Sequence, residues 1–184
     1  YYGTLSITSS TISSNSAWGT GGGIFNNAGT LSVISSTISG NSTYEIGGGI
    51  FNSDNGIINV TSSTISSNSA EGYGGGIFSW GPMNITKSTL SGNSAASAGG
   101  IFTGGTINIT SSTISGNSAI NRNYALDSGG GIYNDSLGTL NVTNSTISGN
   151  STTDDGGGIY SWGTLTITNS TLSENSADGS GDSL

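Results

Sequence analysis

The sequence predicts an all-β protein with one architecture, a right-handed parallel β-helix, in which successive turns of the chain stack on one another. Three observations predict this β-solenoid: a segment that recurs seven times, strict alternation of aliphatic and hydroxyl residues, and glycine runs at fixed places. We expect residues 1–184 to form a single domain of about seven coils of 24 to 33 residues, with three short strands per coil.

The recurring segment is Ser-Thr-Ile-Ser or Ser-Thr-Leu-Ser, followed by one variable residue and Asn-Ser. Its threonine occupies Thr11, Thr37, Thr64, Thr89, Thr113, Thr146 and Thr171. The spacing falls to 24 residues from 89 to 113 and rises to 33 from 113 to 146. A repeat that tolerates insertions indicates rigid strands joined by loops of adjustable length.

Three strands are expected in each coil. The first alternates strictly, as in residues 164–168, Thr-Leu-Thr-Ile-Thr, so its aliphatic side chains share one face. The second is the Ser-Thr-Ile-Ser unit, with its isoleucine or leucine inward, and the third follows the glycine run and begins with isoleucine. One coil cannot bury these side chains alone, so stacking must create the core.

An asparagine recurs at the bend after the second strand, and we expect its copies to form an asparagine ladder in which stacked amides bond to the coils above and below. The ladder residues are Asn15, Asn41, Asn68, Asn93, Asn117, Asn150 and Asn175. A role as simple turn formers is compatible with this one. The predicted role is structural, not binding.

An aromatic residue follows the inward isoleucine of the third strand in six coils. These residues are Phe25, Phe51, Phe78, Phe102, Tyr133 and Tyr160. Because adjacent strand residues face opposite ways, they are expected to stack outward as a partner surface, which Trp80 and Trp162 would extend. Loops that fold over the stack, or rings that point inward, remain equally open alternatives.

The composition excludes several classes of function. The net charge of -8, with Lys87 and Arg122 as the basic residues, disfavours nucleic acid, and no apolar run is long enough for a transmembrane segment. The chain has no histidine or cysteine, and nearly all of its ten acidic residues fall in variable loops. We therefore expect no catalytic site and no cofactor.

One acidic segment resembles a metal loop. Asp178 and Asp182, in the order Asp-Gly-Ser-Gly-Asp, match the start of an oxygen-ligand calcium loop, although no distal glutamate follows them. Weak calcium binding is the hypothesis at this place, and a solvated acidic turn is the favoured alternative.

The second strand also carries a regular array of hydroxyls. Its Thr-x-Ser pairs begin with Thr11 and Ser13 and continue to Thr171 and Ser173. A flat Thr-x-Ser array on a β-solenoid resembles ice-binding surfaces, which makes ice binding a hypothesis. The alternative is that β-branched hydroxyl residues simply suit solvated strands.

A family resemblance rests on the unit Gly-Thr-Leu-Asn-Val-Thr-Asn-Ser-Thr-Ile-Ser-Gly-Asn-Ser of residues 138–151, followed by Gly-Gly-Gly-Ile-Tyr at 156–160. These units resemble β-helix repeats of bacterial surface proteins and the GGA(I/L/V) and FxxN repeats of chlamydial polymorphic outer-membrane proteins. Here GGAI is replaced by Gly-Gly-Gly-Ile, and the Phe of FxxN by Ile or Leu. The resemblance implies an extracellular or cell-surface setting, and the wider pectate-lyase-like superfamily leaves an enzyme as an alternative.

The predicted function is accordingly a non-catalytic structural or adhesive role outside the cell. The first strand begins almost at once and no capping segment is evident, so we expect a segment of a longer structure whose end coils self-associate head to tail into a filament. The first alternative is a module that binds or cleaves carbohydrate, and the second is an ice-binding protein.

Overall fold

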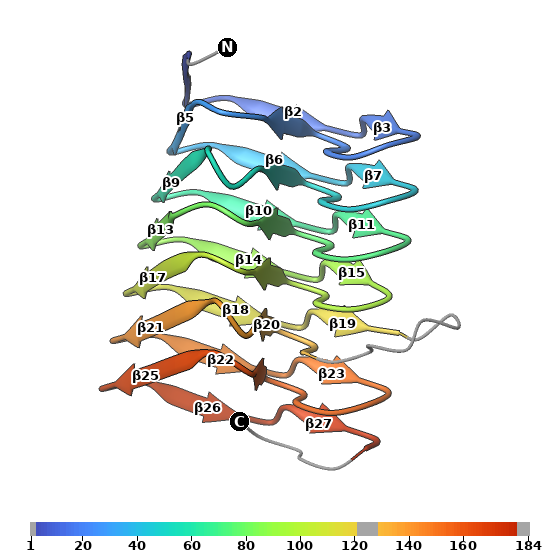
Figure 1. Ribbon diagram of the computed structural model, residues 1–184, viewed down its shortest axis with the longest axis vertical. Coiled ribbons are helices and arrows are strands. Elements are labelled where there is room, and N and C mark those ends of the chain that lie inside the picture. Colours follow the sequence, from blue (N-terminus) through green and yellow to red (C-terminus); the bar gives the residue numbers. More distant parts are fainter. Residues whose placement is uncertain (1–2, 121–128, 180–184) are drawn as a thin grey trace.

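The computed structural model describes residues 3–120 and 129–179, and within them the chain forms 27 short β-strands. The strands build four parallel sheets that run the length of a solenoid (Figure 1). Each strand pairs with its equivalent in the next coil, with identical positions in register, as in Ile65 beside Leu90. The predicted stacking of equivalent residues is therefore confirmed.

The four sheets are named in chain order. The first contains β1 (Thr4–Thr8), β5 (Thr30–Ile34), β9 (Ile57–Thr61), β13 (Met83–Thr86), β17 (Thr106–Thr110), β21 (Thr139–Thr143) and β25 (Thr164–Thr168). The second contains β2 (Thr11–Ser13), β6 (Thr37–Ser39), β10 (Thr64–Ser66), β14 (Thr89–Ser91), β18 (Thr113–Ser115), β22 (Thr146–Ser148) and β26 (Thr171–Ser173). The third contains β3 (Ser16–Ala17), β7 (Ser42–Thr43), β11 (Ser69–Ala70), β15 (Ser94–Ala95), β19 (Ser118–Ala119), β23 (Ser151–Thr152) and β27 (Ser176–Ala177). The fourth contains β4 (Ile24–Asn26), β8 (Ile50–Asn52), β12 (Ile77–Ser79), β16 (Ile101–Thr103), β20 (Ile132–Asn134) and β24 (Ile159–Ser161).

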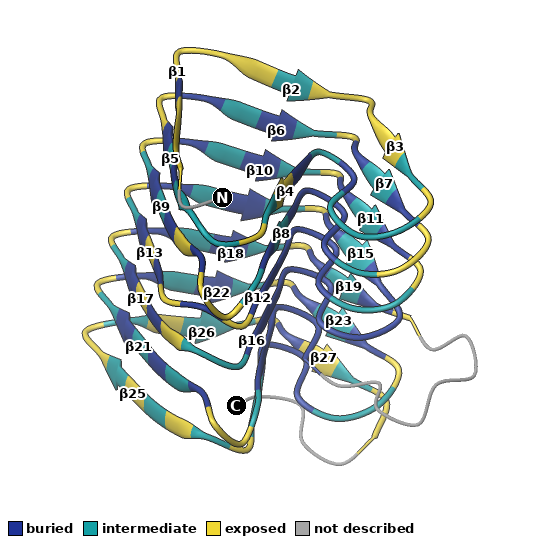
Figure 2. Cartoon of the chain, turned by 45° about the horizontal axis from the view of Figure 1, so that its top comes forward, coloured by how far each residue is buried: buried dark blue, intermediate teal, exposed yellow. Residues whose placement is uncertain are grey.

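The coil is right-handed. Figure 2 looks partly down from the N-terminal end, and the chain passes from β1 through β2 and β3 to β4 in a clockwise sense as it moves away from the viewer. Three sheets have seven strands and the fourth has six, so the seven repeats make about six complete turns.

Each coil has one more strand than the three that the sequence predicts. The additional strand is the two-residue pair directly after the ladder asparagine, which forms the third sheet. Two residues are too few to show alternation, so the periodicity of the sequence gives no signal for them. The remaining three strands lie where the repeat predicts them.

The interior is filled by stacked aliphatic side chains. Leu31, Ile38, Ile58, Ile65 and their equivalents in the central coils are fully buried in one continuous cluster. The first and last coils each have a neighbour on one side within the described chain, and Leu5 is accordingly 50% exposed. The core therefore exists between coils and not within one coil.

The asparagine ladder is confirmed. In each central coil the side-chain oxygen accepts two bonds from the preceding coil, as when Asn68 donates its backbone N–H and its Nδ2 to Oδ1 of Asn93, both at 3.0 Å. Nδ2 of Asn93 donates to Ile65 O at 3.0 Å and to Oδ1 of Asn117 at 2.9 Å. All four bonding positions of the amide are satisfied although the side chain is fully buried.

The glycine runs make room for this ladder. A Cβ added to Gly76 would lie 3.1 Å from Nδ2 of Asn93 in the next coil, and one added to Gly75 would collide with the carbonyl oxygens of Ser94 and Gly99. Gly74 has a φ of +67°, in the left-handed region that favours glycine. The asparagine and the glycine run, separated in the repeat, are thus two halves of one packed corner.

Two further polar rows link the coils. The first is a row of serines at the bend between the first two sheets. The hydroxyl of each serine accepts a hydrogen bond from the backbone N–H of the equivalent serine in the preceding coil, as Ser88 Oγ does from Ser63 at 3.1 Å. In the second, at the end of the fourth sheet, Asn52 donates Nδ2 to Ser79 Oγ at 2.9 Å. The second row is interrupted at Thr103, whose hydroxyl donates to Gly105 O, and the buried Oδ1 of Asn134 has no hydrogen-bond partner.

The first prediction compares two asparagine rows. We expect Asn93→Ala to lower the free energy of unfolding by about 4 kcal/mol, because it leaves two buried donors of Asn68 without an acceptor. Asn84 lies in an exposed row, where its Nδ2 donates to Oδ1 of Asn59 and its Oδ1 accepts from Nδ2 of Asn108, so Asn84→Ala should cost about 0.5 kcal/mol. Denaturant unfolding followed by circular dichroism measures both, and equal losses would contradict the structural role of the buried ladder.

The second prediction repairs the interrupted row. An asparagine in place of Thr103 presents an Nδ2 toward Oδ1 of Asn134, as Asn26 does toward Asn52 in the same row, where the two atoms lie 2.6 Å apart. We expect Thr103→Asn to raise the free energy of unfolding by about 1 kcal/mol. Thr103→Ser adds no amide donor and serves as the control; a melting temperature that rises in neither variant refutes the interpretation.

Candidate functional site

The outer side of the fourth sheet carries a column of aromatic rings. In each strand the isoleucine packs into the core and the next residue points outward, where six rings stack from coil to coil. The centroid distance is shortest, at 4.6 Å, between Phe78 and Phe102, and Phe102 lies 5.0 Å from Tyr133. Figure 2 shows the strands that carry the column side by side on one wall of the solenoid.

The column is not exposed along its whole length. Phe25 is 55% exposed, and Phe51 and Tyr160 are half-buried. Phe78, Phe102 and Tyr133 are buried, with exposed fractions of 3%, 8% and 6%. The outward direction follows the expected alternation, but the middle of the expected exposed stripe is covered, in agreement with the alternative in which neighbouring segments fold over it.

Two rings reach the middle of the column from opposite ends of β12. Tyr73, which precedes the strand, meets Phe102 at 5.7 Å with ring planes 62° apart. Trp80, which follows the strand, meets Phe102 at 5.4 Å and 74°. Trp80 lies on Gly104 of the next coil, where any Cβ would overlap the indole ring. The lack of a side chain at Gly104 therefore makes room for the Trp80 ring.

An open hollow of about 380 Å³ lies against these rings. It is lined by Ile46, Tyr73, Phe78, Trp80, Phe102, Tyr133 and Asp135. Within the described residues Asp135 is the one charged side chain in this lining, and it is half-buried. The backbone of Asp135 is held by two hydrogen bonds. Its carbonyl accepts from the N–H of Gly138 in the same loop at 2.8 Å, and its N–H donates to Thr103 O of the preceding coil at 2.9 Å.

The electrostatic character of the hollow is seen at Tyr133. Burial raises the pKa of this phenol above its ordinary value, and the neighbouring Asp135, Tyr160 and Tyr73 raise the pKa further. The environment of Tyr133 thus resists an additional negative charge.

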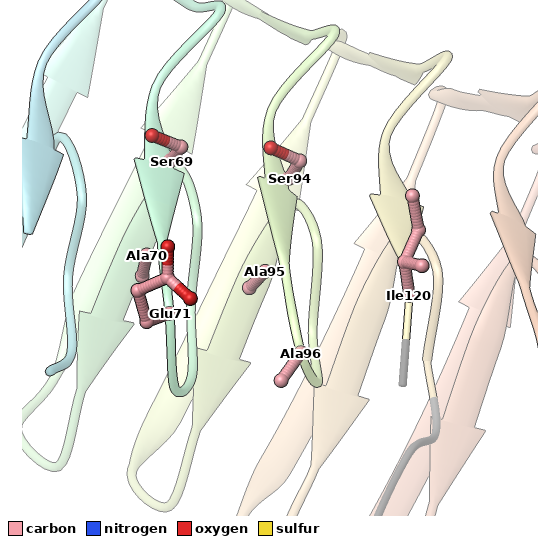
Figure 3. Close-up of a pocket in the computed structure, with 7 residues that line it drawn as sticks. All are labelled: Ser69, Ala70, Glu71, Ser94, Ala95, Ala96 and Ile120. Atoms are coloured by element: carbon pink, nitrogen blue, oxygen red, sulfur yellow. The ribbon is translucent and has the colours of Figure 1, made fainter. Parts of the chain in front are cut away.

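A second hollow lies over the third sheet. It is smaller, about 150 Å³, and is lined by Ser69, Ala70, Glu71, Ser94, Ala95, Ala96 and Ile120. Figure 3 shows that these side chains come from three successive coils and that Glu71 is the one carboxylate among them. General acid and base catalysis by carboxylates needs a pair, which this hollow does not supply.

Within residues 3–120 and 129–179, no three or more acidic side chains lie close enough together to hold a metal ion. Of the two calcium candidates, Asp178 continues the third sheet by donating its N–H to Thr152 O at 3.2 Å, and Asp182 lies outside the described residues. In the same described ranges, no helix has the length and apolar character to cross a membrane.

Sequence reasoning named Trp80 as an extension of the aromatic surface but missed Ile46, Tyr73 and Asp135. Ile46 and Tyr73 directly precede the glycine runs of their coils, a position filled by Thr20 and Ser97 in two others. The large apolar side chains at this loop position were the signal in the sequence that these loops pack against the aromatic column. Asp135 follows Asn134 where Ser53 follows Asn52, so a carboxylate that departs from the repeat marked this place.

Taken together, the four in-register sheets and the stacked core define this chain as a parallel β-solenoid repeat protein. Residues 62–79 and 144–161 match the family model of the Chlamydia polymorphic membrane protein repeat. Searches of curated proteins and of solved structures gave no significant match. The chain is therefore a β-helix repeat protein that resembles these repeats over two segments.

Each matched segment has the same structural content. It runs from the bend before a strand of the second sheet to the end of a strand of the fourth sheet, as from Ser62 to Ser79. It therefore includes the ladder asparagine, the glycine run and the outward aromatic residue. What matches the family is the packed corner and the aromatic wall beside it.

The third prediction tests whether the middle of the column stabilises the fold. We expect Phe102→Ala to lower the free energy of unfolding by about 4 kcal/mol, because the ring is buried between Phe78 and Tyr133. Phe25→Ala removes the same ring where it is mostly exposed, at a cost of about 1 kcal/mol. Thermal and denaturant unfolding of the two variants would refute this assignment if the losses were the same.

Proposed function

We propose that the chain is a non-catalytic structural solenoid of a cell-surface or extracellular protein, with an adhesive surface on the outer side of its fourth sheet. The observation that carries this proposal is the aromatic column with its open hollow, since exposed aromatic side chains are typical of protein interfaces. Phe25, Trp80 and Trp162 keep 55%, 40% and 64% of their surface exposed on this wall.

A surface location is supported by the family match. The matched model is named for a membrane protein of Chlamydia, and the solenoid with that repeat fits a surface-exposed repeat protein. A stack of similar coils also gives a rigid wall whose length grows with the number of repeats. Such a wall suits the presentation of a binding surface.

A non-catalytic role is supported by the distribution of reactive groups. Glu71 in the hollow of the third sheet and Asp135 in that of the fourth each stand as the one carboxylate of their lining, within the described residues. Hydrolysis or elimination on a polysaccharide needs at least two cooperating groups at one bond. Binding of a carbohydrate without cleavage stays as the alternative.

The fourth prediction tests adhesion. Beads coated with the folded chain should adhere to cultured epithelial cells, and the double variant Phe25→Ser/Trp162→Ser should lose most of this adhesion. Trp18→Ser is the control, because Trp18 is 81% exposed but directly follows β3 and stacks on Tyr44, which is not a ring of the aromatic column. Adhesion that is no greater than that of blocked beads, or equal loss in the control, contradicts the proposal.

The same material separates the carbohydrate alternatives. Binding on a glycan array without new reducing ends or unsaturated products from the bound polysaccharide would assign the wall to carbohydrate recognition. Release of such products would replace the proposal with an enzyme.

A finer proposal is head-to-tail stacking into filaments. Two copies whose end coils meet would continue all four parallel sheets, because every coil presents the same backbone pattern to the next. Size-exclusion chromatography and electron microscopy over a wide concentration range test this, and monomers throughout would reject it.

Ice binding is supported by one specific feature. The Thr-x-Ser pairs of the second sheet lie in register over its seven strands, as Thr64, Thr89 and Thr113 do. The decisive measurement is thermal hysteresis with observation of ice-crystal shape, and the absence of both would remove this candidate.

A further inference from the structure

The hollow beside Phe102 is bordered by the rings of Tyr73 and Trp80 and contains one carboxylate, that of Asp135. The ring planes of Tyr73 and Trp80 stand across the stacked column, at 62° and 74° to that of Phe102. Trp80 is 40% exposed, so part of its ring remains open to an incoming group. Asp135 is the one charged side chain of the lining within the described residues.

The charge of the chain favours a cation at this place. The net charge is -8 and the sequence contains two basic residues, of which Lys87 lies at the bend between the first and second sheets. No basic side chain lines the hollow within the described residues. Among the described residues, a positively charged group that enters the hollow meets Asp135 and aromatic rings, and no positively charged side chain of the lining repels it.

Among biological cations, the guanidinium group of arginine fits this lining best. It is planar and weakly hydrated, it stacks on aromatic faces, and its fork of N–H donors pairs with a carboxylate through two hydrogen bonds. The ammonium of lysine is compact and strongly hydrated, so it loses more on entering a largely apolar hollow. A sugar ring needs several polar partners, and this lining is mostly carbon.

We propose that this hollow is the binding site for an arginine side chain of a partner protein, with the guanidinium against Trp80 and paired with Asp135. This inference rests on the proposed adhesive function and names the chemistry of the partner. It places the recognition site in the coils of β12, β16 and β20, in the middle of the wall.

The fifth prediction is tested by titrating the full chain with the peptide acetyl-Gly-Ser-Arg-Ser-Gly-amide and with the same peptide containing citrulline or lysine. Citrulline has the shape of arginine without its charge. We expect the arginine peptide to bind about tenfold more tightly than either of the others, with a shift of the Trp80 indole N–H resonance in nuclear magnetic resonance spectra. The indole signals of Trp18 and Trp162 should remain in place.

Asp135→Asn should weaken binding of the arginine peptide by about tenfold, and Asp54→Asn, which makes the same change in net charge at an exposed turn, should leave it unchanged. If Asp135→Asn lowers the melting temperature, Asp135→Ser replaces it, because Ser53 occupies the corresponding position beside Asn52. Equal binding of arginine and citrulline peptides, equal binding of the lysine peptide, or a shift confined to Trp162 would overturn the inference.

The same variants separate this inference from the proposed function. If coated beads adhere to cells but the peptide does not bind, the arginine site is refuted while the adhesive role stands. If the peptide binds and Asp135→Asn beads lose adhesion, both are supported.

Discussion

The structure depends on one interaction, the hydrogen bonds of a buried asparagine to the coils on both sides of it. Oδ1 of Asn93 accepts two bonds from Asn68, and its Nδ2 donates to Ile65 O and Asn117. A slip of the chain by one residue would take Asn93 out of line with Asn68 and Asn117 and leave their buried donors and acceptors without partners, which is costly. The ladder therefore fixes register, and the aliphatic columns, which tolerate exchange of Ile, Leu, Val and Met, need only fill the space it defines.

The same interaction explains why the repeat tolerates insertions. The separation of successive ladder residues ranges from 24 to 33 in the sequence, yet the bond from Asn93 to Asn117 and the bond from Asn117 to Asn150 both measure 2.9 Å. The position of the chain is constrained only at the corner and at the glycine run against which the asparagine packs, as Asn93 packs against Gly76. Chain between the third sheet and the glycine run can lengthen without disturbing either, because loops carry little of the register.

The fold could be predicted from the sequence because its determinants are periodic. Positions that stack on one another carry the same type of residue in successive repeats. The recurrence of Ile65, Asn68 and Gly76 therefore predicts a column of equivalent residues at each of these positions. The candidate site could be predicted only in part. The outward direction of Phe102 follows from alternation, but its burial depends on Tyr73, Trp80 and Gly104, whose meeting is set by loop paths that alternation does not encode. The third sheet was missed because its strands are two residues long.

The position of the hollow follows from where the repeat is broken. Thr103 interrupts the polar row at the end of the fourth sheet and leaves Oδ1 of Asn134 without a partner. The adjacent Gly104 makes room for Trp80, and Asp135 directly follows Asn134. A perfect repeat would give a uniform wall with no preferred place on it. These departures from the repeat lie in neighbouring coils around one aromatic hollow, and one of them removes a hydrogen bond from the polar row of the fourth sheet.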